Sequence, residues 1–185
     1  MGGGRPAALA RMVDCELRRS SPTTAMSNAE PPPLARALGR IPSGLFVVTT
    51  RSADRPLGLV ASFVQQVGID PPTVCVAVGK NRPHVAAIRS AGAFAVCVLD
   101  AESEKVMGRF FRKHDPGEDP FDGLACFGGP CGSPLLSEAL AWVDCRLCGE
   151  HALGDHVVLF GQVVDGRLAR EGNPSVHLRR NGLSY

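Results

Sequence analysis

Three short, β-branched segments that follow one another closely constrain the fold of this chain more than any other feature. They are GLFVVTTR at residues 44–51, LGLVASFVQQVGI at 57–69 and TVCVAVG at 73–79. Val, Thr and Phe favour extended structure, and the intervening SADRP and DPP are typical of turns. Strands joined by such short connections pair antiparallel, because a parallel pair needs a crossover of a dozen residues or more. This region predicts an antiparallel meander.

The rest of the chain alternates further strands with short helices. Apolar periodicity and helix-stop residues predict helices at 34–41, 84–90 and 100–111. Alternating apolar runs predict strands at 93–99, 141–153, 155–166 and 175–185. A Gly- and Pro-rich stretch at 112–134 predicts a long loop of the kind that forms lids or binding loops. The fold class that follows is mainly β, a closed antiparallel β-barrel with two or three short helices.

Residues 1–33 differ from the rest of the chain. They contain MGGG and SSPTTAMSNAEPPP and show no sustained apolar period, which predicts a disordered N-terminal leader. One domain is expected to follow over residues 34–185. The composition of the whole chain, 44% hydrophobic and 21% charged, is that of an ordinary globular domain with a buried core.

Charge, hydropathy and cysteine usage exclude several classes of function. A formal net charge of +2, with few aromatic residues among the basic ones, argues against a nucleic-acid partner. No apolar run approaches the roughly 20 residues of a membrane span, and no secretory signal is evident, so no membrane association is expected. Seven cysteines, an odd number in a chain of this size, suit a reducing compartment. These features predict a cytoplasmic protein.

Two motifs have metal-like or catalytic spacing. CRLC at 145–148 lacks a second ligand pair and lies in a predicted strand, where Cys145 and Cys148 would point to opposite faces. In GEHALGDHVVLFGQVV, at 149–164, His151 and His156 are five residues apart with no carboxylate cluster to complete a ligand set. We expect no metal site. The histidines are left as either half-buried structural residues or part of a pocket rim.

Three further segments could contact a ligand. Small residues at Gly58, Ala61 and Ser62 would let a flat ligand lie against the backbone, or would simply permit close packing. RFFRKH at 109–114 could clamp an anion or form a solvated helix end. A cluster at a strand-to-helix junction suits an anion such as phosphate, or forms a solvated basic loop. This cluster comprises Lys80, Asn81, Arg82 and His84.

Taken together, these motifs resemble a known family. ALGRIPSGLFVVTT, GLVASFVQQVGIDPP, GKNRPHVAAIRSAGAFAVCVL, GEHALGDHVVLFGQVV and LRRNGLSY occur in the order and spacing of flavin reductase-like proteins with the FMN-binding split-barrel fold. The resemblance covers residues 34–185. The form GLVASFVQQ is especially similar to the reductase module of cyanobacterial diflavin proteins.

The resemblance implies roles for particular residues. It places Val60, Ala61, Ser62 and Phe63 along the isoalloxazine ring and Gln65 and Gln66 near the ribityl chain. It assigns binding of the flavin phosphate to the segment containing Lys80, Asn81, Arg82 and His84. It also implies that His156 faces the nicotinamide and is the catalytic residue. The family's commoner TASSF-x-SVS pattern is altered here at Val60, Phe63, Gln66 and Gly68, so FAD remains an alternative to FMN.

The activity implied by the resemblance is an NAD(P)H-dependent flavin oxidoreductase. Hydride would pass from the nicotinamide of NADH or NADPH to the flavin, because the cofactor supplies the redox chemistry and the protein supplies binding. The electrons would pass to a monooxygenase or redox protein, or leave as free reduced flavin. The resemblance also implies a homodimer. The alternative is an FMN-binding electron carrier without a nicotinamide site of its own.

Overall fold

The computed structural model describes residues 30–53, 55–111 and 118–183. Its helices are α1 (Pro33–Leu38), α2 (Pro83–Ala91), the 3-10 turn η1 (Ala101–Ser103) and α3 (Glu104–Phe111). Its strands are β1 (Ser43–Gly44), β2 (Phe46–Arg51), β3 (Pro56–Ala61), β4 (Val64–Ile69), β5 (Pro72–Gly79), β6 (Ala93–Val98), β7 (Cys126–Gly128), β8 (Pro134–Leu136), β9 (Ala141–Leu153), β10 (His156–Leu168) and β11 (Val176–His177). The prediction of a mainly β fold with a few short helices is confirmed.

The predicted leader lies almost entirely outside the described residues, which begin at Glu30. Its disorder and the domain boundary at residue 34 therefore stay predictions. Within the described part of the chain, no helix has the length and apolar character needed to span a membrane.

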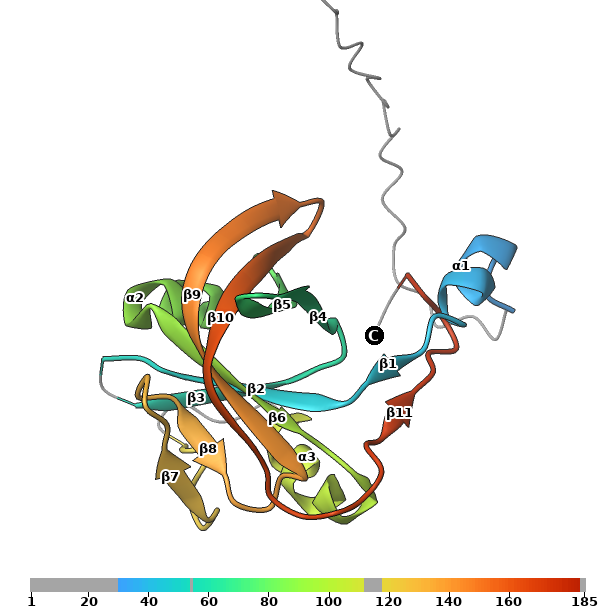
Figure 1. Cartoon of the computed structure of the whole chain (residues 1–185). Helices are drawn as coiled ribbons and strands as arrows, with labels where there is room; N and C mark the ends of the chain where they lie inside the picture. Colours follow the sequence, from blue (N-terminus) through green and yellow to red (C-terminus); the bar gives the residue numbers. More distant parts are fainter. Residues whose placement is uncertain (1–29, 54, 112–117, 184–185) are drawn as a thin grey trace, which may run out of the picture. The chain divides into compact units, whose positions relative to one another are not determined.

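Seven strands form one antiparallel sheet in the order β3-β2-β6-β9-β10-β5-β4 (Figure 1). Its longest ladder joins β9 to β10, with register shifts at Phe160/Gly161 and Val163/Asp165. The predicted antiparallel pairing is confirmed, whereas the continuous meander predicted over residues 44–79 is wrong, because β3 and β4 lie at opposite edges of the sheet. β3 and β4 are the two edges of the sheet in the described pairings, so closure of the barrel stays a prediction.

The single strand predicted over 57–69 is wrong, because the structure has two strands there. β3 pairs with β2 up to Ala61, whereas β4 begins at Val64 and pairs with β5 on the opposite edge of the sheet. The chain changes edge at Ser62 and Phe63, and the Phe63 carbonyl accepts a hydrogen bond of 2.9 Å from the Ala77 amide. The sequence gives no sign of this corner, because apolar residues flank Ser62 on both sides and no turn residue marks it. Ser62 is itself buried.

Two other segments also differ from prediction. The expected loop at 112–134 contains β7, and β8 begins at its last residue; these strands pair with each other. Residues 112–117 of that loop lie outside the described residues. The strand expected at 175–185 is only the two-residue β11, which pairs with β1 in a ribbon beside the main sheet (Figure 1).

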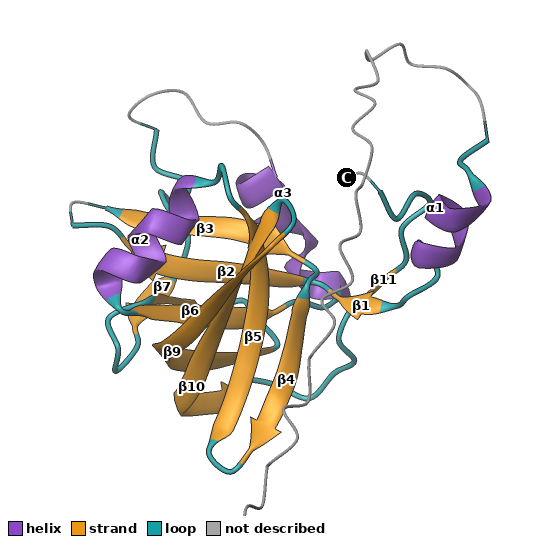
Figure 2. Cartoon of the chain, turned by 90° about the horizontal axis from the view of Figure 1, so that it is seen from above, coloured by secondary structure: helices purple, strands orange, loops and turns teal. Residues whose placement is uncertain are grey.

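The sheet separates two hydrophobic clusters. Adjacent residues alternate between them, as in Val47 and Val48 on β2 or Ala95 and Phe94 on β6, because successive side chains in a strand point to opposite faces. Side chains of α3 and β8 complete the first cluster, here called the α3 core. Side chains of α2 complete the second, the α2 core, and this helix lies across β2 and β3 (Figure 2).

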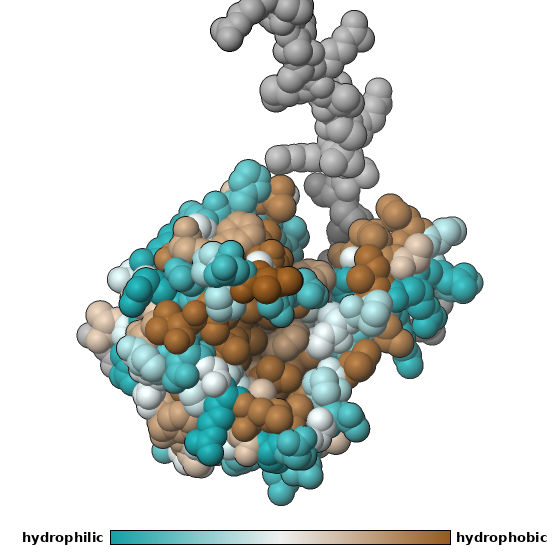
Figure 3. Space-filling model, in the orientation of Figure 1, coloured by the Kyte–Doolittle hydropathy of each residue, from teal (hydrophilic) through white to brown (hydrophobic). Residues whose placement is uncertain are grey.

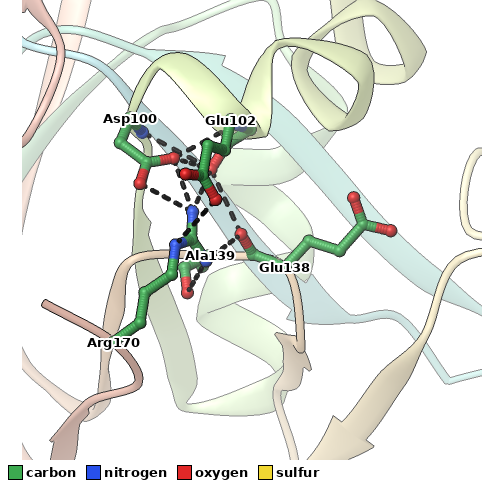
Figure 4. Close-up of polar contacts among 6 residues, drawn as sticks. Asp100, Glu102, Glu138, Ala139 and Arg170 are labelled. Atoms are coloured by element: carbon green, nitrogen blue, oxygen red, sulfur yellow. Dashed lines mark hydrogen bonds and ion pairs between the residues drawn. The ribbon is translucent and has the colours of Figure 1, made fainter. Parts of the chain in front are cut away.

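A largely buried ion pair fixes the segment that leads from β10 to β11. Arg170 Nη2 donates to both carboxylate oxygens of Asp100, at 2.6 and 2.7 Å, and Nη1 donates to the carbonyls of Glu138 and Ala139 (Figure 4). The hydroxyl and amide of Ser103 also donate to Asp100. The Ser103 hydroxyl and the Arg170 guanidinium hold the pKa of Asp100 below its ordinary value.

We expect Asp100→Asn to lower the free energy of unfolding by about 2 kcal/mol at pH 7, because Arg170 loses its charged partner. The folded pKa lies below the unfolded value of about 3.9. The carboxylate therefore stabilises fully above the unfolded pKa, and this contribution is lost as the pH falls through the folded pKa. Denaturant unfolding at pH 7 and pH 3 should show the difference between the two proteins shrinking.

Glu102→Gln provides the matched control. The Glu102 side chain is 81% exposed and its carboxylate lies 3.5 Å from Arg170 Nε, so its removal should change stability by less than about 1 kcal/mol. Equal losses in the two variants at pH 7 would contradict the assignment of Asp100 as the essential partner.

Candidate functional site

The described residues form a groove of about 610 Å³ between the β1–β11 ribbon and strands β4, β5 and β10. Apolar side chains gather around the hollow in the middle of this face (Figure 3). No charged side chain belongs to the described lining. The lining residues are Ile41, Pro42, Ser43, Gly44, Phe46, Ser62, Phe63, Val64, Gln65, Cys75, Ala77, Val98, Val158, Pro174, Ser175 and Val176. An uncharged groove of this kind suits a flat, largely apolar ligand.

Three of the residues predicted to contact a ligand line this groove: Ser62, Phe63 and Gln65. They occupy the corner between β3 and β4 and the start of β4. Phe63 and Gln65 are two residues apart in an extended segment, so their side chains share a face. The structure therefore brings together the central part of the predicted ligand segment.

Three neighbouring residues are placed differently. Val60 packs against the α3 core, while Ala61 is buried in the α2 core. Gln66 is exposed, and its amide donates to the carbonyl of Gly68 at 3.2 Å. None of these three residues belongs to the described lining of the groove.

His156 adjoins the groove through Phe63. It begins β10, opposite Gly79 at the end of β5, and its ring meets that of Phe63 edge to face with centroids 5.8 Å apart. Nδ1 lies 2.7 Å from Asp155 Oδ1, and this hydrogen bond lowers the pKa of the Asp155 carboxyl. Because Asp155 engages Nδ1, Nε2 is the ring nitrogen that would serve a ligand.

Lys80, Asn81 and Arg82 form the exposed turn between β5 and α2. The Lys80 amide donates to the Asp155 carbonyl at 2.9 Å, which places this turn directly beside His156. Arg82 is the N-cap residue of the nine-residue α2 and makes no capping hydrogen bond with its side chain. Two cationic side chains thus stand at the positive end of a helix dipole, an arrangement that favours an anion.

His84 is turned away from this exposed turn. Its Nε2 lies 3.0 Å from the Gly58 carbonyl, so it joins the first turn of α2 to β3. A carbonyl only accepts, so Nε2 carries the hydrogen, and Nδ1 is buried with no hydrogen-bond partner among the described residues. Burial lowers the pKa of His84. The structure therefore separates His84 from the other three residues of the predicted anion cluster.

The CRLC cysteines have different environments, as expected for an extended segment. Cys145 is buried in the α2 core, and burial raises the pKa of its thiol to about 12. Cys148 is exposed, and its thiol lies 3.3 Å from the Phe160 carbonyl. Among the residues that the structure describes, no group of three or more His, Cys, Asp or Glu side chains could hold a metal ion.

The sequence profile of the family described as flavin reductase like domain matches residues 38–182. The chain belongs to this family. The family predicted from the sequence is therefore confirmed.

Known relatives agree with this membership. Diflavin flavoprotein A 1 of Synechocystis sp. (strain ATCC 27184) is 32% identical over 154 residues, which cover 82% of this chain. The chain spans only about 27% of that protein's length.

Among solved structures, a homologue of nitrilotriacetate monooxygenase component B from Mycobacterium thermoresistibile has a TM-score of 0.73 at 29% identity, covering 79% of this chain and 81% of its own. The NADH:FAD oxidoreductase SgcE6 of Streptomyces globisporus C-1027 has a TM-score of 0.71 at 32% identity, covering 78% of this chain and 86% of its own. Another structure of SgcE6 is a complex with NAD and FAD fragments.

Sequence reasoning missed the wall of the groove formed by residues 41–44 and 174–176. These segments are far apart in the chain and meet through the short β1–β11 ribbon. The sequence predicts strands at 44–51 and 175–185 but gives no sign that the two segments pair. Sequence reasoning also missed Arg179, whose guanidinium carbon lies 4.6 Å from the centroid of the Phe63 ring. The LRRNGLSY motif contributes to the family resemblance, but nothing in it indicates that Arg179 contacts Phe63.

We expect the free energy of unfolding to fall as the pH drops below about 6.5, the ordinary histidine value, in part because of His84. Its folded pKa is lowered, so in this range the unfolded chain binds more protons than the folded protein does. His84→Gln retains a donor for the Gly58 carbonyl but does not titrate in this range. Denaturant unfolding at pH 5.5 and 7.5 should show a smaller loss in the variant, and identical losses would contradict the prediction.

Proposed function

We propose that this protein is an NAD(P)H-dependent flavin oxidoreductase that binds FMN in the groove and transfers hydride to it from a nicotinamide. The observation that carries the proposal is the uncharged groove itself, with the Phe63 ring on its wall in contact with His156. Family membership and the relative that is an NADH:FAD oxidoreductase support the same activity.

The residues of the groove fit a flavin. Its volume of about 610 Å³ is within the range of small-molecule sites. A flat tricyclic ring would bury apolar surface against Phe63, Val64 and Val158, while Ser62 and Gln65 bring polar groups to the same wall. The FAD fragment in the SgcE6 complex keeps FAD as the alternative to FMN.

A bound flavin would supply the hydride chemistry, and the protein would bind, orient and exclude water. We assign packing against the ring to Ser62 and Phe63, with backbone contacts from Val60 and Ala61, and the ribityl chain to Gln65 and Gln66. His156, held through Nδ1 by Asp155, would orient the nicotinamide with Nε2. The phosphate would bind Lys80, Asn81 and Arg82, and His84 would hold α2 in place through its contact with the Gly58 carbonyl.

The electron acceptor is proposed to be a monooxygenase or another redox protein, reached directly or through free reduced flavin. One similar structure is of a homologue of a monooxygenase component, and one relative contains a similar module within a longer diflavin chain. We also propose a cytoplasmic homodimer. Apolar side chains near the groove support a second copy, because Ile41, Val176 and Leu178 are 59%, 71% and 52% exposed.

The absorbance spectrum of the purified protein tests the proposal directly. We expect a visible flavin band, present on purification or after addition of FMN, that bleaches on anaerobic addition of NADH or NADPH. The more effective donor identifies the preferred nucleotide. A band that persists with both donors would instead indicate the carrier without a nicotinamide site, and failure to bind FMN or FAD would refute both functions.

His156→Ala should raise KM for the nicotinamide donor or lower kcat, with a combined loss of about tenfold or more in kcat/KM. His151→Ala is the matched control, because His151 is exposed on β9 and has no place in the groove lining. Steady-state kinetics with NADH and NADPH provide the measurement. A His156→Ala enzyme with wild-type kcat and KM would remove His156 from the mechanism.

A further inference from the structure

The C-terminal arm, residues 174–183, is held firmly against the start of the domain. β11 pairs with β1, and the Gly182 amide donates to the Ala35 carbonyl at 2.8 Å. A Cβ at Gly39 would collide with the Arg179 carbonyl, and one at Gly182 would collide with Leu38. The backbone of Arg179 is therefore fixed by close contacts, which reduces the conformational entropy lost when its side chain binds a ligand.

Arg179 connects the two walls of the groove. The arm supplies Pro174, Ser175 and Val176 to one wall, and Phe63 belongs to the other. The guanidinium carbon of Arg179 lies 4.6 Å from the centroid of the Phe63 ring, which also contacts His156. Arg179 thus places a positive charge beside Phe63, in a groove whose described lining carries no charged side chain.

The chemistry of a guanidinium on an aromatic face favours one class of ligand. The guanidinium carbon lies over the aromatic ring. A guanidinium also carries a planar fork of N–H donors that can bind an oxyanion in a bidentate manner. Phosphate is the oxyanion common to flavin nucleotides and nicotinamide dinucleotides, and bidentate phosphate binding is a preferred role of arginine.

We propose that Arg179 is a specificity-determining residue that binds a phosphate group of the nucleotide entering the groove. This inference rests on the proposed function, because it assumes that a nucleotide occupies the groove. The phosphate belongs to the flavin nucleotide or to the nicotinamide donor. Arg180, the exposed neighbour in sequence, serves as the comparison residue.

The test compares ligands with and without phosphate in wild type, Arg179→Gln, Arg179→Lys and Arg180→Gln. Flavin affinity is measured by fluorescence titration with FMN and with riboflavin. Donor efficiency is measured as kcat/KM with NADH and with 1-benzyl-1,4-dihydronicotinamide, which lacks phosphate. Thermal unfolding of each variant confirms that it remains folded.

We expect Arg179→Gln to weaken one phosphate-bearing ligand by about tenfold and to leave its phosphate-free partner unchanged. Loss confined to FMN assigns the flavin phosphate, and loss confined to NADH assigns the donor. Arg179→Lys should cause an intermediate loss, because lysine keeps the positive charge but lacks the planar guanidinium that binds phosphate in a bidentate manner. Arg180→Gln should match wild type.

Equal effects of Arg179→Gln on ligands with and without phosphate, or no effect on any of them, would overturn the proposal while leaving the reductase function intact. An Arg180→Gln loss equal to that of Arg179→Gln would also overturn it, since general positive charge would then explain the binding. A wild-type protein that binds neither flavin and oxidises neither donor would refute the proposed function itself.

Discussion

The ladder between β9 and β10 is the constraint on which the rest of the structure depends. The first half of β9 pairs with β6, from Ala141 to Arg146, and the first half of β10 pairs with β5, from His156 to Gln162. The two strands therefore join two half-sheets into one. Their close approach needs a glycine at position 161, where a Cβ would lie 2.5 Å from the Phe94 ring and 2.7 Å from Cys145.

The groove follows from this arrangement. Because β3 and β4 are opposite edges of the sheet, the two residues between them, Ser62 and Phe63, form a corner that lines the space beside the sheet. The β1–β11 ribbon supplies the facing wall, and the Asp100–Arg170 pair directs the chain from β10 toward that ribbon. The lining of the groove and the structural contacts thus come from adjacent residues of the same segments.

Much of the fold could be predicted because strands and helices carry local periodic patterns. The strands at 93–99 and 141–153 and the helix at 84–90 were found close to their observed limits. The corner at Ser62 was missed because apolar residues flank it on both sides. The short length of β11 was missed because this strand is defined by its pairing with β1, a segment distant in the sequence. The contact of His84 with the Gly58 carbonyl could not be predicted either. A histidine close to lysine and arginine in the sequence gives no sign of a carbonyl partner in another strand.

The pairing of β1 with β11 has a consequence for the order of events during synthesis. One wall of the groove combines residues 41–44 with residues 174–176, so it cannot form until nearly the whole domain has left the ribosome. Contacts of such high sequence separation form late, after the cost of closing the intervening chain has been met. A ligand that contacts both walls would therefore bind only the fully folded domain. Its binding would stabilise that state and none of the partly folded states that precede it.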